Sequence, residues 1–128
     1  MRSSAAAGLV ALALVGCGGG SAHHGKNATA KAADNCLRAA GGKVTGDPDH
    51  RPPGGPPGLE RELVVALSGA GAFIAFYDTG AHAKAAEPDV RKSAEKFGGL
   101  VVRDQNTTIA YTKKPAGDVR RRIEDCVF

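Results

Sequence analysis

The side chains best suited to acid–base chemistry in this chain are Asp78 and His82, which are four residues apart. On a helix this spacing places a carboxylate and an imidazole on one face, and such a pair can exchange protons near neutral pH. His50 is a third candidate and lies in a stretch rich in proline and glycine. An enzyme or metal-binding protein that uses His82, Asp78 and His50 is therefore one hypothesis, although such pairs more often form surface contacts or helix caps.

Motifs of the common catalytic classes are absent from the sequence. Ser68 is flanked by Leu67 and Gly69 and does not form the Gly-x-Ser-x-Gly turn of a serine hydrolase. The glycines at 69 and 71 are not followed by the lysine of a phosphate-binding loop. Adjacent His23 and His24 point in opposite directions on an extended chain, with no cysteine or carboxylate close by. We therefore expect no metal site, no cofactor and no catalytic residues.

Cys17 carries the strongest signal in the sequence. It ends the run Leu-Val-Gly-Cys at residues 14–17, which follows Arg2 and an apolar stretch at residues 5–15. A helix that crosses a bilayer needs about 20 apolar residues, so this stretch is too short to span but has the length of a signal-peptide core. The arrangement resembles the leader of bacterial lipoproteins, whose cleavage motif ends in the cysteine that receives the lipid.

The resemblance implies that residues 1–16 are a signal peptide and that Cys17 carries acyl chains such as palmitate on its sulfur. Two or more acyl chains hold a protein firmly on a bilayer, where one does not. The chain would then be anchored to the cell membrane, on its extracytoplasmic side. Residues 17–27 have few large apolar side chains and are predicted to be a flexible tether. An ordinary secretory leader and a buried start to a cytosolic domain are the alternatives.

Cys36 and Cys126 form an even pair once Cys17 is assigned to lipid. Disulfides form in oxidising compartments outside the cytoplasm, so export favours a single bridge between these two cysteines. The bridge would close a loop of about 90 residues, and a loop of that length stabilises a fold by roughly 4 to 5 kcal/mol in the chain-entropy model. Two buried free thiols are the alternative. Neither cysteine has a Cys-x-x-Cys partner, which argues against thioredoxin-type redox chemistry.

Composition limits the remaining possibilities. The chain has 128 residues, enough for one domain after the leader, and a formal net charge of +4. Its basic residues are dispersed, and their only run is at residues 120–122. No aromatic platform accompanies this charge, so nucleic-acid binding is not expected. Residues 28–128 are predicted to form a single disulfide-linked domain.

The apolar pattern of residues 28–128 predicts three helices and two hairpins. Each hairpin consists of two runs of β-prone residues joined by a turn, at residues 63–77 and 100–111. The helices are indicated by apolar residues at helical spacing. These residues are Ala32, Ala33, Cys36, Leu37 and Ala40 in the first helix, Ala83, Ala86, Val90, Ala94 and Phe97 in the second, and Val119, Ile123, Cys126 and Val127 in the third.

The predicted fold is therefore α+β: a helix followed by two ββα units. The four strands would form a mainly antiparallel sheet with the helices on one face, as a two-layer sandwich. A brief extended piece is expected at residues 43–45, and residues 46–58 are expected to form a long Pro/Gly loop. Pro88 is expected to kink or divide the second helix. Phe73 and Phe97 are expected to add bulk to an otherwise thin core.

These observations favour a non-catalytic binding or assembly module of the cell envelope. Its partners would be the lipid bilayer, through acylated Cys17, and an unknown envelope protein, wall polymer or small ligand. An open sheet face lined with exposed aromatic side chains would favour binding, whereas a deep pocket that collects His82, Asp78 and further carboxylates would favour an enzyme.

Overall fold

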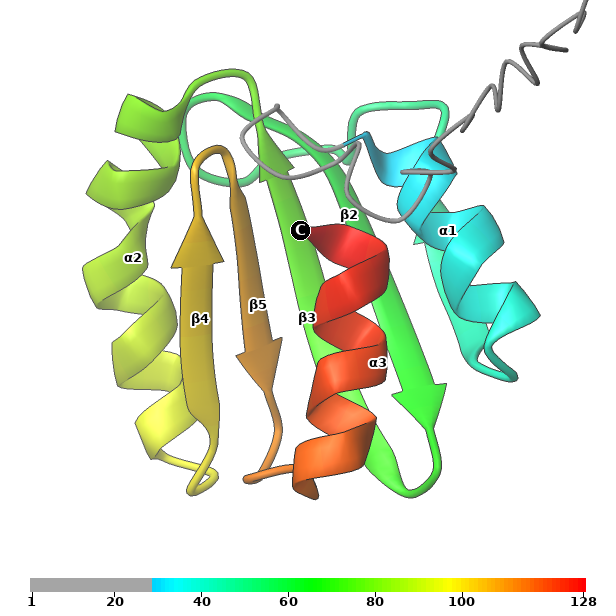
Figure 1. Ribbon diagram of the computed structural model, residues 1–128. Coiled ribbons are helices and arrows are strands. Elements are labelled where there is room, and N and C mark those ends of the chain that lie inside the picture. The colour runs from blue at the N-terminus through cyan, green and yellow to red at the C-terminus, as the bar shows by residue number, and fades with distance from the viewer. Residues whose placement is uncertain (1–28) are drawn as a thin grey trace, which may run out of the picture.

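The computed structural model describes residues 29–128. The predictions for the leader, for Cys17 and for the tether concern residues outside this range. Three helices and five strands alternate along the described chain (Figure 1). They are α1 (Ala30–Ala39), β1 (Lys43–Asp47), β2 (Leu59–Leu67), β3 (Ala70–Tyr77), α2 (Gly80–Glu95), β4 (Leu100–Asp104), β5 (Thr107–Tyr111) and α3 (Gly117–Val127).

The strands form one antiparallel sheet in the order β1-β2-β3-β5-β4. Both predicted hairpins are present, β2 with β3 and β4 with β5. The turn between β2 and β3 consists of Ser68 and Gly69, which both have positive φ (48° and 82°). Turns of this kind match the right-handed twist of paired strands. The α+β class and the order of the predicted elements are thus confirmed.

The sheet has five strands, not the predicted four. The piece expected at residues 43–45 extends over Lys43–Asp47 and pairs with β2 along its whole length. Val44 is buried under α1 and supplies the apolar contact for this edge strand. The predicted loop at 46–58 therefore begins only after Asp47. Gly46 lies within this strand. Only glycine fits there, because the φ of +105° and the close carbonyl of Glu62 leave no room for a side chain.

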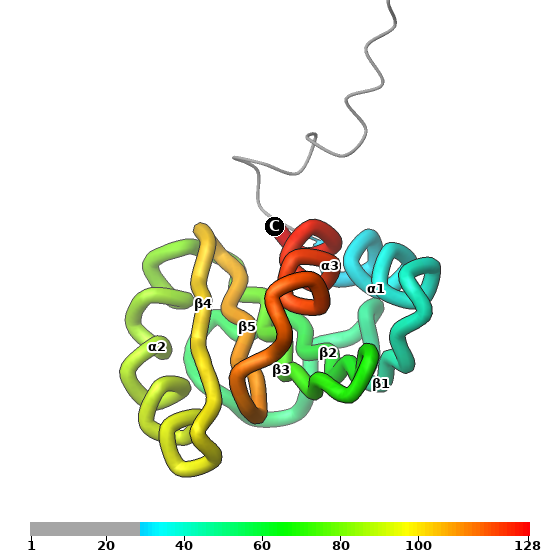
Figure 2. Tube along the Cα trace, turned by 60° about the horizontal axis from the view of Figure 1, so that its bottom comes forward, coloured from blue at the N-terminus to red at the C-terminus, as the bar shows by residue number. Residues whose placement is uncertain are grey.

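Helices α1 and α3 lie side by side on one face of the sheet, which we call the front face (Figure 2). The main core lies between these helices and the strands. A cross-strand row of Leu63, Ile74 and Ile109, all fully buried, forms its floor. All four residues predicted to be buried in the last helix are buried in α3. In α1, Leu37 is buried as predicted.

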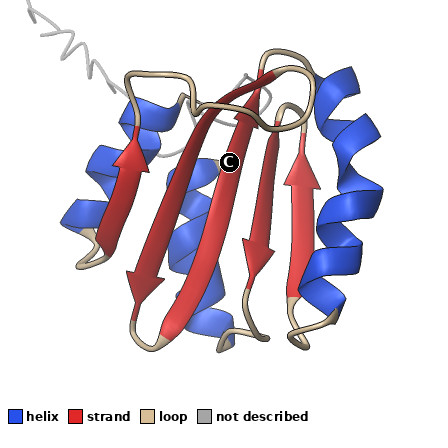
Figure 3. Cartoon of the chain, turned by 180° about the vertical axis from the view of Figure 1, so that it is seen from behind, coloured by secondary structure: helices blue, strands red, loops and turns tan. Residues whose placement is uncertain are grey.

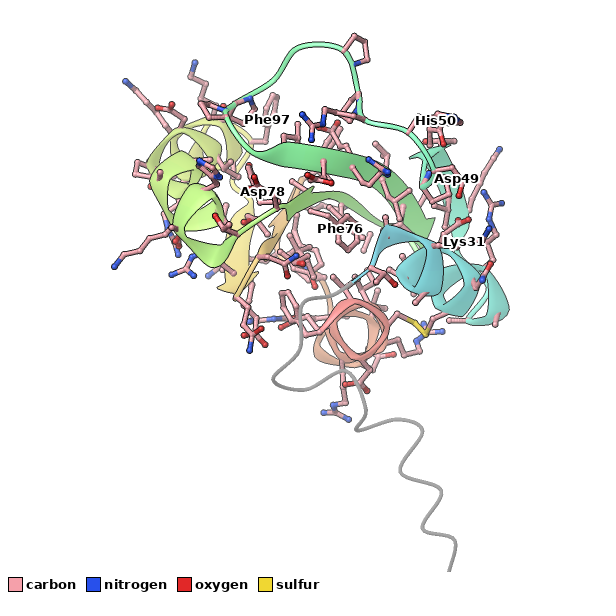
Figure 4. All side chains as sticks on the ribbon, turned by 90° about the horizontal axis from the view of Figure 1, so that it is seen from above. Lys31, Asp49, His50, Phe76, Asp78 and Phe97 are labelled. Carbon is pink, nitrogen blue, oxygen red and sulfur yellow. A yellow bond between two sulfur atoms is a disulfide. The ribbon has the colours of Figure 1, made fainter. Side chains whose placement is uncertain are left out.

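The prediction that all helices cover one face is wrong. Helix α2 packs on the opposite face, which we call the back face, where Ala83 and Ala86 contact Leu59 and Tyr77 (Figure 4). The reason is the chain path. Strands β3 and β4 are both antiparallel to β5 and therefore run in the same direction. A connection between two such strands is almost always right-handed, and this handedness determines the face on which α2 lies.

The predicted disulfide is confirmed. Cys36 of α1 and Cys126 of α3 are joined with an S–S distance of 2.05 Å and a Cα–Cα distance of 5.4 Å. Cys126 is buried as predicted, whereas Cys36 lies on the exposed flank of α1 and not on its inward stripe as predicted. The bridge therefore links the exposed flank of α1 to the buried face of α3.

Helix α2 is continuous through Pro88, so of the two predicted outcomes, a kink or a division, the division is absent. Glu87, just before the proline, connects this part of the helix to its surroundings. Its carboxylate accepts hydrogen bonds from Arg91 in the same helix (2.6 Å) and from Arg103 in β4 (2.7 Å). These hydrogen bonds lower the pKa of Glu87, the one from Arg103 most. The middle of α2 is thereby tied to the edge of the sheet.

Candidate functional site

The back face of the sheet is only partly covered. One cross-strand row on this face runs from Val101 in β4 through Ala110 in β5, Phe73 in β3 and Val64 in β2 to Thr45 in β1. Val101 is buried, but Phe73 is 47% exposed. This difference arises because α2 packs mainly over β4 and β5 on this face, whereas the helix over β1 and β2, α1, lies on the front face.

The partial cover leaves a largely apolar groove between α2 and the strands, with a volume of about 520 Å³. Volumes of several hundred Å³ with mainly apolar walls are typical of ligand pockets. Its floor consists of Phe73 and Ala110. Side chains of α2 and the residues just after it form one wall. The residues of this wall are Ala86, Asp89, Val90, Ser93, Ala94 and Phe97.

Two aromatic side chains that we expected in the core are instead exposed at the groove. Phe73 points to the back face because β3 places alternate side chains on opposite faces, and its neighbours Ala72 and Ile74 point to the front. Phe97 is 72% exposed because it follows the last residue of α2, at the end where the chain turns toward β4. Figure 4 shows Phe97 on the α2 side of the sheet. Exposed aromatic side chains beside an apolar hollow are characteristic of binding surfaces.

The groove adjoins a second, smaller cavity of about 180 Å³. Both are lined by Phe73, Ala110, Val90 and Pro56, so they meet at these residues. The smaller cavity adds polar groups to the site: Glu62, Tyr77 and Thr108.

The polar groups of the smaller cavity lie close together in the sheet. Glu62, Ala75 and Thr108 are cross-strand neighbours on β2, β3 and β5. Thr108 is 1% exposed, and its Oγ1 has no hydrogen-bond partner within residues 29–128. Burial raises the pKa of Tyr77, and the negative charge of Glu62 raises it further. This end of the site therefore combines a carboxyl group with two hydroxyl groups.

The loop between β1 and β2 closes one side of the groove. It crosses the end of the sheet on the back face, as Figure 3 shows from behind, and its Pro56 lines both cavities. The loop is attached beside α2, because Gly58 accepts a hydrogen bond from the Asp78 backbone (2.9 Å). Gly58 has a φ of +81° and packs directly against the side chains of Asp78 and His82. A Cβ atom at this position has no room, so only glycine fits the close approach.

The sequence candidates for acid–base chemistry form two separate pairs. His82 Nδ1 lies 2.6 Å from Asp78 Oδ1, so the predicted contact between them is present. His50 Nδ1 lies 2.7 Å from Asp47 Oδ2 and does not join that pair. Figure 4 shows His50 and Asp78 well apart, near the ends of different strands. The structure therefore does not assemble His82, Asp78 and His50 into one site.

Each pair has the properties of a surface contact. The hydrogen bond from His82 lowers the pKa of Asp78, and the backbone N–H of Asp49 is the largest cause of the lowered pKa of Asp47. Both carboxylates therefore remain ionised at neutral pH. The side chains of His82 and His50 are 44% and 81% exposed. Neither histidine lines the apolar groove, so the enzyme hypothesis receives no support beyond the His82–Asp78 contact.

Within the described part of the chain, no three His, Cys, Asp or Glu side chains gather in a way that could hold a metal ion. Nor does any helix in this range have the length and apolar character needed to cross a membrane. The chain matches no known family model, no characterised protein and no solved structure. The functional argument therefore depends on the groove itself.

Sequence reasoning missed the groove, although one signal pointed toward it. Val90 and Phe97 continue the helical stripe of Ala83, Ala86 and Ala94, and the three alanines alone are buried. In the structure the three alanines pack on the sheet, whereas Val90 is half-buried and Phe97 is exposed, both at the groove. The sequence alone does not show which residues of a stripe contact the sheet.

Proposed function

We propose that this protein is a lipid-anchored envelope protein whose domain binds a ligand in the groove without catalysing a reaction. The observation that carries the proposal is the apolar groove of about 520 Å³, with Phe73 and Phe97 exposed at its floor and its end. Burial of their exposed apolar surface by a ligand would stabilise the complex by about 25 cal/mol per Å².

The location is proposed from the sequence of residues 1–17. A cationic residue, a short apolar stretch and the run that ends in Cys17 support export and lipid attachment. The disulfide between Cys36 and Cys126 is consistent with this location, because such bridges persist in oxidising compartments. The ligand would then be a molecule of the cell envelope or its surroundings.

The binding proposal is tested with a neutral, apolar fluorescent probe, N-phenyl-1-naphthylamine, and the full chain carrying Cys17→Ser so that no detergent is needed. We expect saturable fluorescence enhancement that falls at least tenfold in affinity in the Phe73→Ala/Phe97→Ala variant. Phe128→Ala is the matched control, because Phe128 packs against the front-face core. Equal probe affinity in the groove variant and the wild type would refute binding in the groove.

The anchoring proposal is tested separately by cell fractionation. The wild-type chain should be found with the membranes and incorporate labelled palmitate. The Cys17→Ser variant should lose the label and be released from the membranes. Retention of the variant in the membrane fraction, or absence of label from the wild type, would refute lipid attachment at Cys17.

A further inference from the structure

The groove also carries information about the charge of its ligand. Only two charged side chains line the two cavities, and both are acidic: Asp89 in the wall of the groove and Glu62 in the smaller cavity. This is opposite in sign to the net charge of the chain, which is +4. Neither carboxylate forms a hydrogen bond or an ion pair with another side chain of residues 29–128, whereas Glu60 and Glu87 nearby are paired with arginine.

We infer that the ligand is a small lipophilic cation, with an apolar body and a protonated amine. This inference rests on the proposed function, since it assigns a ligand class to the same groove. The apolar body would lie along Phe73, Val90 and Phe97, and the amine would lie in the smaller cavity. Glu62 and Asp89 are exposed residues at the edge of an apolar hollow, and carboxylates in that position attract a positive charge and repel a negative one.

The register of the sheet shows where the amine would lie. Glu62, Ala75 and Thr108 are neighbours in one cross-strand row, so the methyl group of Ala75 lies between a carboxylate and a hydroxyl. Directly opposite side chains in paired strands have Cβ atoms about 5 Å apart. An ammonium group above Ala75 is therefore near both Glu62 and Thr108. Its N–H groups can donate to the Glu62 carboxylate, which lines the smaller cavity.

The cationic neighbour of this position is turned toward another carboxylate. Arg103 follows Thr108 in the same cross-strand row, on β4. Its guanidinium donates to Glu87 at 2.7 Å, and Arg103 does not line either cavity. The charged side chains that line the two cavities are therefore acidic alone.

The aromatic residues of the groove favour the same class of ligand. The face of an aromatic ring attracts cations as well as apolar groups. A fatty acid would fit the apolar walls equally well, but its carboxylate would approach Glu62 or Asp89 without a cation to bind it. Like charges in such a position reduce affinity. The structure thus distinguishes between two amphiphiles of the same shape by the sign of their charge.

The test compares three probes with the same decyl chain, decylamine, decanol and decanoate, below their micelle concentrations at neutral pH. Each competes with N-phenyl-1-naphthylamine for the full chain carrying Cys17→Ser. We expect decylamine to bind about tenfold more tightly than decanoate, with decanol between them, and this ratio corresponds to about 1.4 kcal/mol. Added salt should reduce the preference, because it screens the two carboxylates.

The Glu62→Gln/Asp89→Asn variant is the matched control, because both side chains keep their shape and lose their charge. It should lose the preference of the wild type for decylamine over decanol and decanoate. Equal affinity of the wild type for decylamine and decanoate would overturn the inference while leaving groove binding intact, and so would a preference that persists in the variant. Failure of all three probes and of the neutral dye to bind would overturn the proposed function as well.

Discussion

Removal of the bridge between Cys36 and Cys126 should destabilise the fold strongly. The two residues are 90 positions apart, so the bridge restricts nearly the whole described chain when it is unfolded. The chain-entropy relation gives a loss of about 15 cal/mol/K for a loop of this length, or about 4.6 kcal/mol at 25 °C. This is a large part of the 5 to 15 kcal/mol that typically separates a folded domain from its unfolded chain.

The structure indicates that other effects of the substitution are small. Cys36 is exposed and Cys126 is a buried member of the main core, so Cys36→Ala/Cys126→Ala removes a single sulfur atom from that core. Leu37 and Val127, beside the two cysteines, remain fully packed in the main core. The cost of the double substitution should therefore come mainly from the unfolded state, and we expect 3 to 5 kcal/mol, roughly the calculated loop term.

The assay is equilibrium urea unfolding, followed by circular dichroism, in a background that carries Cys17→Ser to prevent thiol exchange. The oxidised protein is compared with the alanine variant and with the same protein after reduction. Both comparisons should give the same loss of unfolding free energy. The slope with urea should rise, because an unfolded chain without the bridge exposes more surface. A loss below about 1 kcal/mol, with native-like circular dichroism in the variant, would refute the assignment of stability to loop closure.

Other predictions concern backbone packing and ionisation. Gly99→Ala should destabilise the fold by at least about 2 kcal/mol, because its Cβ would overlap the backbone carbonyl of Tyr111. The control, Gly117→Ala, meets open space and should be neutral or stabilising by up to about 1 kcal/mol. The urea midpoints of the two variants measure both effects. The pKa of Glu87 is lower in the fold than its ordinary value of 4.5, so its ion pairs stabilise the fold above pH 4.5 and this contribution is lost as the pH falls through the lower folded value. Glu87→Gln should therefore be less stable at pH 7 and lose less stability on acidification, and parallel acid-unfolding curves for the two proteins would contradict this. The pKa values of Tyr77 and Tyr111 are raised above 10.0, mainly by burial. Phenolate absorbance should therefore appear at a higher pH than for free tyrosine, together with alkaline unfolding. Titration of either tyrosine at its ordinary value in the folded chain would show that the ring is accessible to water.

Local chemistry explains which elements could be predicted from the sequence. The buried face of α3 could be predicted in full, because charged residues separate its apolar residues at helical spacing. The hairpin of β2 and β3 is visible because Ser68 and Gly69 interrupt two strongly β-prone runs. The disulfide followed from the count of cysteines once export was assumed. In each case the signal lies within a few neighbouring residues.

The remaining features depend on contacts between distant segments. β1 is short and contains Gly46, so its own sequence indicates a strand only weakly, and its pairing with β2 makes it one. The face covered by α2 follows from the direction of β4 relative to β3. This relative direction cannot be predicted from the local sequence of either strand. The groove requires Phe73, Val90 and Pro56, from three different elements, to line one hollow. Its individual residues look like core or loop residues when they are taken singly.

The position of Thr29 sets how an anchored domain would face its surroundings. Thr29 caps the start of α1, which lies with α3 on the front face (Figure 2). The groove opens on the back face, beyond the thickness of the sheet. The described chain therefore begins with a helix on the face of the sheet opposite the groove. A surface attachment through this end of the described chain would leave the mouth of the groove uncovered.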